Sequence, residues 1–264
     1  MKIQTLVSFV SFVAALAVCA SAAAGQSCEP RRPKPVEVRA GLQLAYKVQQ
    51  HLETLEADVA VVGRVGRDLS EYRLRYSHIG LAVRDRTQNR WNVVHLLNHC
   101  GKADSDLYVQ GLGNFFLDDL FRYEAVVLVP SRELQGKLAE AIANGGGRRL
   151  HQPHYSLIAH PYSAKYQNSN QWLLELAAAR VAGGEQNRAA AHARLIQDQF
   201  QPSVLPLPPL KRLGARLFSI NTQFDDHSAE EWSTSRYQVV SAESVLGWFA
   251  RADQSMGQFV VTLP

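Results

Sequence analysis

The sequence predicts an α+β fold, in which an antiparallel sheet is flanked by helices. Apolar runs typical of strands are concentrated between about residues 57 and 130, whereas apolar residues at helical spacing dominate the segments before and after them. With 264 residues and 46% hydrophobic content, the chain is long enough to bury a core as one large domain or two small ones.

Residues 1–24 are interpreted as a secretory signal peptide. They combine a lysine, an apolar run and small residues in Ala-x-Ala patterns, so cleavage is expected near Ala24 or Gly25. A membrane anchor is the alternative, but the apolar run of roughly ten to fifteen residues is shorter than the ~20 that span a bilayer. Lipid attachment at Cys19 is a further alternative. We therefore expect a protein that is periplasmic or secreted after cleavage.

The chain that remains after cleavage is mildly basic. Loss of Lys2 with the leader lowers the formal net charge from +4 to +3, and the Lys and Arg residues are spread along the sequence. This distribution argues against a nucleic-acid partner. No later segment has the length and purity of a membrane-spanning helix, and no phosphate-binding glycine loop is evident, so no cofactor is expected.

Two cysteines, Cys28 and Cys100, remain in the mature chain. In an oxidising compartment an even pair favours one disulfide, which would tie the mature N-terminus to the core. Two unpaired thiols are the alternative.

Helix and strand patterns follow one another along the first half. Apolar residues at three- and four-residue steps predict a helix from about Val36 to Glu56. Strands are then expected in ADVAVVGRVG, YSHIGLAVRD and RWNVVHLL, the last two joined as a hairpin by turn-forming residues 85–89. GLGNFF is interpreted as a turn with core packing. A further strand, RYEAVVLVP, ends at Pro130, and the helix SRELQGKLAEAIA follows it.

The second half is predicted to be mainly helical. One helix begins at Ser169 and ends before Gly183, and another continues to about Phe200. PSVLPLPPL is interpreted as a stiff proline-rich connector. The tail combines a strand in SRYQVV, a short helix around Val245 and a last strand, GQFVVTL. Residues 25–201 are therefore assigned to the α+β domain, and residues 202–264 to an extension that packs on it.

Three polar residues stand where chemistry would be expected. His78 and His95 lie on the two strands of the predicted hairpin, where side chains can point to one face and come into contact. Ser169 opens a helix, whose N-terminus concentrates backbone N–H groups and favours an oxyanion. Nucleophile, base and orienting group form a general catalytic arrangement.

The motifs that carry these residues resemble the permuted NlpC-like branch of the papain-like fold and the lecithin:retinol acyltransferase-like proteins, which share its layout. The likeness rests on HIGLAV, VVHLL and QNSNQWLLE and covers about residues 75–178. The wider pattern, from YSHIGLAVRD through YQNSNQWLLE to DDH, also resembles a family of exported bacterial proteins with a domain of unknown function. The resemblance implies a permuted papain-like antiparallel sheet with flanking helices.

The resemblance also implies a cell-envelope hydrolase of cysteine-peptidase type, or an acyl or amide transferase, that acts on a peptide or an acyl or amide conjugate. Ser169 would attack the carbonyl, His78 would act as base and His95 would orient His78. The resemblance calls for cysteine at the position of Ser169. A serine hydroxyl cannot become an anion near neutral pH as a thiol can, so it needs a well-oriented neutral base.

Neighbouring side chains are expected to contact the substrate: Tyr76, His154, Tyr155, Tyr166, Asn168, Asn170 and Trp172. Asn168 and Ser169 are also typical helix caps, and Gln171 completes a capping box. His151, His154 and His160 lack a carboxylate or cysteine at ligand spacing, so no metal site is predicted. Two other interpretations stay open: a non-catalytic envelope protein that keeps the cleft to bind peptide or glycan, and a structural domain.

Overall fold

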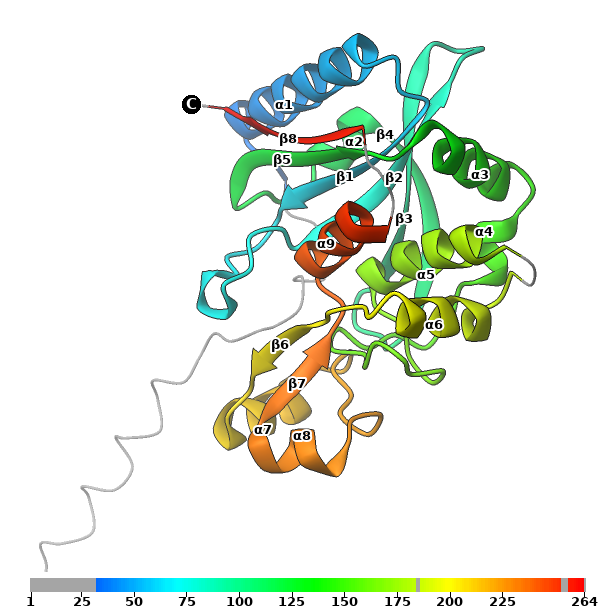
Figure 1. Cartoon of the computed structure of the whole chain (residues 1–264). Coiled ribbons are helices and arrows are strands. Elements are labelled where there is room, and N and C mark those ends of the chain that lie inside the picture. The colour runs from blue at the N-terminus through cyan, green and yellow to red at the C-terminus, as the bar shows by residue number, and fades with distance from the viewer. Residues whose placement is uncertain (1–31, 184–185, 253–255, 264) are drawn as a thin grey trace, which may run out of the picture.

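The computed structural model describes residues 32–183, 186–252 and 256–263. The predicted signal peptide and Cys28 lie outside these ranges. In the described part, six strands form one sheet in the order β4-β3-β2-β1-β5-β8, every neighbouring pair is antiparallel, and helices cover both faces (Figure 1). The predicted α+β class with an antiparallel sheet is thus confirmed. No helix in the described ranges is long and apolar enough to cross a membrane.

The sheet is built around the predicted hairpin, in which Asp85 pairs with Arg90 and Leu81 with Val94. Asn89, in the connecting turn, has a positive φ of 46°, a conformation that asparagine tolerates well. One edge strand, β4, was not expected from the sequence. The strands of the sheet are β1 (Val59–Val65), β2 (His78–Asp85), β3 (Arg90–Asn98), β4 (Ser105–Gly111), β5 (Arg122–Val129) and β8 (Gly257–Thr262).

Alternation along the strands divides the core into two layers. On one face, Val61 and Leu81 pack with apolar residues of the helices α3 (Arg132–Ala143), α5 (Ser169–Ala182) and α9 (Ala242–Ala252). On the other face, Val62 and Ala82 pack with α1 (Pro35–Thr54) and α2 (Leu112–Phe116). Each fully buried leucine or valine contributes roughly 1.5–3 kcal/mol, so the two layers together hold the sheet between its helices. The remaining elements on the first face are α4 (Gly146–Arg149) and α6 (Arg188–Gln197).

The helical segments of the first half differ from the prediction in three details. GLGNFF, interpreted as a turn with core packing, forms the helix α2 instead of a turn, whereas its core packing is confirmed: Phe115 and Phe116 are buried in the layer beneath α1. The predicted helix from Val36 begins one residue earlier, at Pro35, which suits a first helical position because proline lacks an N–H. A single 3₁₀ turn, η1 (Ser70–Tyr72), lies between β1 and β2.

The C-terminal part contributes a small unit and one strand of the main sheet. PSVLPLPPL, interpreted as a stiff proline-rich connector, contains the strand β6 (Ser203–Pro206), which pairs antiparallel with β7 (Arg236–Val239). The helices α7 (Pro209–Phe218) and α8 (Ala229–Thr234) complete this unit around a third apolar cluster. Strand β8 then returns to the main sheet and pairs with β5 (Figure 1).

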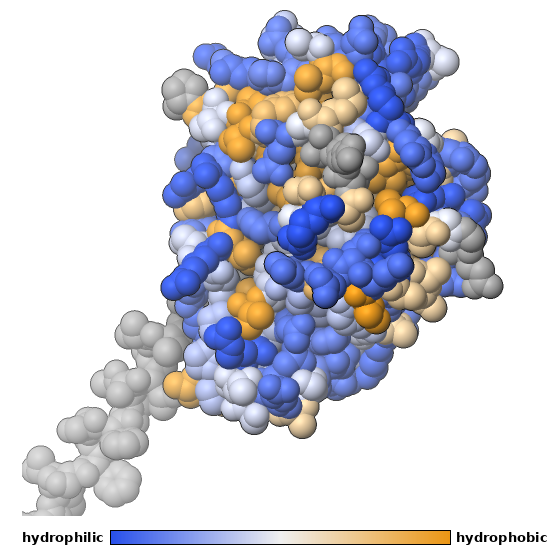
Figure 2. All heavy atoms as spheres, viewed as in Figure 1, coloured by the Kyte–Doolittle hydropathy of each residue, from blue (hydrophilic) through white to orange (hydrophobic). Residues whose placement is uncertain are grey.

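One face of the molecule shows how its surface is divided. The surface shown in Figure 2 is mostly hydrophilic. An apolar area lies below α1, over the end of the sheet where Figure 1 draws β5 and β8. Val260 of β8 is 49% exposed and Met256, just before the strand, is 44% exposed. Such exposure is common at an edge strand and does not by itself define a site.

Candidate functional site

His78 and His95 meet on the face of the sheet that α1 and α2 cover. His78 Nε2 lies 2.8 Å from His95 Nδ1, so one ring nitrogen donates and the other accepts. Both rings pack on Phe115 of α2, with ring centroids 5.9 Å and 5.3 Å away. The contact across the hairpin that the sequence led us to expect is therefore present.

Gly80 makes room for the histidine pair. A Cβ atom added at Gly80 would lie 2.5 Å from Val93 Cγ1, 3.2 Å from His95 Cβ and 3.4 Å from the Phe115 ring. The first of these separations is shorter than any ordinary contact between carbon atoms. The HIG sequence thus has a steric role, because glycine lets the two strands and α2 close around the imidazoles.

A buried arginine sets the electrostatics of the pair. Arg64 forms a salt bridge with Asp118, donates to the Phe115 carbonyl and lies 4.6 Å over the Phe115 ring. Burial, and next the Arg64 charge, hold the pKa of His78 well below its ordinary value. The same two causes lower the pKa of His95 to about 4, against opposing contributions from Gln110 and Asp118. Both rings are therefore neutral at neutral pH.

Ser169 occupies the first turn of α5 but does not contact this pair. Its Oγ lies 3.5 Å from the Tyr155 hydroxyl, and it makes no hydrogen bond to either histidine. Asn168 is the N-cap of α5: its Oδ1 accepts from Gln171 N at 2.8 Å, and its Nδ2 donates to Val240 O at 3.1 Å. The capping box predicted from the sequence is complete.

The sheet separates Ser169 from the histidines. Ile79 and Leu81 of β2 point toward the core layer that contains α5, whereas His78 points to the opposite side, against Phe115. The nearest link is Asn170, whose Oδ1 accepts from Ile79 N at 3.1 Å at the beginning of β2. A serine–histidine hydrogen bond, the central contact of the predicted catalytic arrangement, is absent between these described residues.

The remaining residues predicted to contact substrate lie in different environments. Trp172 is fully buried and its Nε1 donates to Gly147 O at 3.0 Å. Tyr76 and Tyr155 are buried in the same core layer, and Tyr166 is half-buried beneath the Lys165 ammonium. His154 is the exposed one, with its Nδ1 3.7 Å from Asp104 Oδ1.

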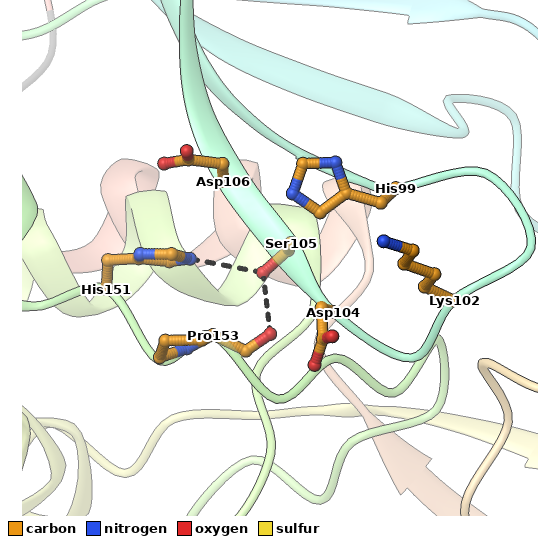
Figure 3. A pocket seen from close by; sticks show the side chains of 7 residues that line it. All are labelled: His99, Lys102, Asp104, Ser105, Asp106, His151 and Pro153. Atoms are coloured by element: carbon orange, nitrogen blue, oxygen red, sulfur yellow. Dashed lines mark hydrogen bonds between the residues drawn. The ribbon is translucent and has the colours of Figure 1, made fainter.

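A polar hollow, which the sequence did not indicate as a site, lies beside His154. It has a volume of about 560 Å³ and opens between the β3–β4 turn and the segment that follows α4 (Figure 3). Its lining carries both signs of charge: Lys102 is positive, and Asp104 and Asp106 are negative. The lining residues are His99, Lys102, Asp104, Ser105, Asp106, His151 and Pro153.

Hydrogen bonds of Ser105 join the two walls of this polar hollow. Ser105 Oγ lies 3.1 Å from His151 Nε2 and 3.3 Å from Pro153 O, as the dashed lines in Figure 3 show. Ser105 N also donates to Pro153 O at 2.9 Å. Ser105 is 4% exposed, and burial lowers the pKa of His151. These bonds join the two walls of the hollow, whereas the charges of Lys102, Asp104 and Asp106 face solvent.

The turn that forms one wall also carries Cys100, which is in a disulfide. Its predicted partner, Cys28, lies outside the described residues. Nowhere in the described ranges are three or more His, Cys, Asp or Glu side chains grouped so that they could hold a metal ion.

The fold and the site define an α+β domain that has helices on both faces of an antiparallel sheet, a mixed-charge hollow and a buried histidine pair. The family described as "uncharacterized protein conserved in bacteria (DUF2145)" matches residues 51–249. The chain belongs to this family. No curated protein and no solved structure matches it.

Proposed function

We propose that the protein is an exported, non-catalytic domain of the bacterial envelope that binds short peptides in the polar hollow. The observation that carries this proposal is the separation of Ser169 from His78 and His95 by the central sheet. A serine nucleophile needs a neutral base within hydrogen-bond reach. The side chain that lies within hydrogen-bond reach of Ser169 is the Tyr155 hydroxyl. Burial raises the pKa of this hydroxyl, so it keeps its proton at neutral pH and cannot accept one from Ser169.

The chemistry of the hollow favours a peptide as ligand. A short peptide carries an ammonium and a carboxylate group, and the hollow offers Asp104 and Asp106 to the first and Lys102 to the second. His99 and His151 add hydrogen-bonding groups for amides. Export to the envelope, which the leader sequence predicts, would bring this hollow to the peptides of the cell wall.

Binding is tested by titrating synthetic cell-wall stem peptides into the protein and measuring heat or chemical-shift changes. We expect Lys102→Ala and Asp104→Asn each to weaken binding at least tenfold, because each removes one charge of the mixed set. Lys137→Ala, which removes an exposed lysine of α3, is the matched control and should bind as the wild type does. Equal affinity in all variants, or binding of neutral glycan strands instead, would count against this proposal.

The rival function is a hydrolase or an acyl or amide transferase with a permuted papain-like arrangement. The bond between Asn170 and Ile79 N favours it, because that bond holds the beginning of α5 beside the strand that carries His78. Ester and amide probes, together with wall peptides, distinguish the two functions in the wild type, Ser169→Ala and Ser169→Cys. Our proposal predicts no turnover and no covalent labelling of Ser169; activity lost only in Ser169→Ala would support the enzyme.

A further inference from the structure

Helix α7 turns its leucines toward solvent. Leu210 is 84% exposed, Leu213 54% and Leu217 66%, and their spacing of three and four residues places them on one face of the helix. Ile220, two residues beyond the helix, is 58% exposed. We call Leu210, Leu213, Leu217 and Ile220 the leucine face.

The opposite side of α7 is fixed to the protein by polar and small residues. Arg212 donates from Nη1 to Trp232 O at 3.1 Å and to the Tyr237 hydroxyl at 2.7 Å, and its guanidinium lies 4.5 Å over the Trp232 ring. Ala215 packs on the third apolar cluster. Helices normally bury their leucines, but here Arg212 and Ala215 take the inward positions, so the outward leucine face is part of a well-anchored helix.

The charges of α7 have a single sign. The helix contains Lys211, Arg212 and Arg216 and no acidic residue. At 100° per residue, Arg216 lies at the border of the leucine face, whereas Lys211 lies nearer the inward side of the helix. Lys211 pairs at the surface with Glu71, whereas Arg216, which is exposed, forms no ion pair with another described residue.

We propose that the leucine face of α7 binds the surface of an anionic lipid bilayer. An apolar face on a helix whose charges are all basic is the arrangement of helices that lie in the interfacial plane, with the leucines at the acyl boundary and Arg216 among the headgroups. A second copy of the chain fits less well. A symmetric pairing of two leucine faces would bring the basic residues of both copies to one interface, and α7 has no acidic residue to pair with them.

The experiment adds vesicles of phosphatidylcholine, with or without phosphatidylglycerol, to the purified full chain. The substitution Leu217→Trp places a fluorescent side chain on α7. The difference between the tryptophan emission of this variant and that of the wild type reports on α7 itself, so adhesion through any other segment does not produce the signal. We expect a blue shift with the anionic vesicles that weakens at high salt. Leu213→Glu in the Leu217→Trp chain should raise the lipid concentration for half-maximal shift at least tenfold.

Two further variants make the result specific. Arg216→Glu keeps the leucines and removes a flanking cation, so it should weaken the response to anionic vesicles several-fold. Leu42→Glu places the same charge on α1, at a leucine that is 46% exposed, and should leave the response unchanged. Circular dichroism confirms that each variant is folded. No blue shift with anionic vesicles, or concentration-dependent dimers that Leu213→Glu abolishes, would overturn the assignment to lipid.

Discussion

His78 Nε2 and His95 Nδ1 lie 2.8 Å apart, both rings pack against Phe115, and neither residue is more than 8% exposed. Burial and the positive charge of Arg64 lower the pKa of both histidines, so neither ring is protonated at neutral pH. The pair therefore acts as a neutral hydrogen-bonded link between two strands.

This neutral pair predicts a stability that falls as the pH is lowered. The pKa of His95 is lowered from 6.5 to about 4, and that of His78 is lowered as well, so the unfolded chain binds more protons below about pH 6.5. The free energy of unfolding should then decrease by about 1.4 kcal/mol per pH unit for each histidine. For His95 the loss is complete near pH 4. Urea unfolding between pH 7 and pH 4.5 measures the slope, and His95→Asn should reduce it; identical slopes would contradict the explanation.

Gly80→Ala should destabilise the protein by about 1–3 kcal/mol, because the added methyl group meets Val93 and His95. Gly136→Ala in α3 is the matched control. Nothing lies within 4 Å of a Cβ at Gly136, so alanine there should stabilise the helix by about 0.5–1 kcal/mol. Thermal and urea unfolding measure both changes, and an equal effect of the two substitutions would refute the steric role of Gly80.

Asn168→Ala should cost about 1–2 kcal/mol, because the variant loses the N-cap of α5 and leaves Val240 O without its donor. Ser169→Ala should cost about 0.5 kcal/mol, since the 3.5 Å separation from Tyr155 is at the limit of hydrogen bonding. Urea unfolding distinguishes the two positions. A larger loss in Ser169→Ala than in Asn168→Ala would show that Ser169 has a structural role that its contacts do not explain.

Glu175 is fully buried and should be the most costly polar residue to alter. Its carboxylate accepts from Arg188 at 2.7 Å and 2.9 Å, and lies 2.7 Å from His192 Nε2. Arg188 also donates to carbonyls of the segment before α5, so the network fastens that segment to α6. Removing one partner of a buried pair costs about 3–5 kcal/mol.

Glu175→Gln is accordingly expected to lower the free energy of unfolding by about 3–5 kcal/mol, and Arg188→Met by a similar amount. The double variant should lose less than the sum of the two, with a coupling of about 1 kcal/mol or more. Chemical denaturation of all four proteins completes the cycle. Strict additivity would mean that Glu175 and Arg188 stabilise the fold independently.

The elements with clear periodicity could be predicted from the sequence. The two apolar runs of β2 and β3 are separated by turn-forming residues 85–89, so the hairpin and the meeting of its histidines could be predicted. Strand β4 was missed, because at this sheet edge Tyr108 and Val109 are exposed and the pattern is too polar. Helix α7 was missed for a related reason: a proline-rich segment precedes it, and its leucines face solvent.

The candidate site could be predicted only in part, because periodicity does not say which face of a sheet a distant helix covers. Both faces of this sheet are buried, so His78 suited either side, and the chain places it opposite α5. The polar hollow joins the β3–β4 turn to residues near His151, a pairing fixed by Ser105 and Pro153 rather than by any motif.

The pairing of β8 with β5 bears on when the protein can fold. Residues 257–262 complete the sheet beside residues 122–129, and they are synthesised long after the strand with which they pair. Until they emerge from the ribosome, the edge of β5 has no partner for its backbone groups and can join another chain. The sheet is thus finished only after β8 has been synthesised, and nascent chains that end before residue 257 expose the edge of β5 to aggregation.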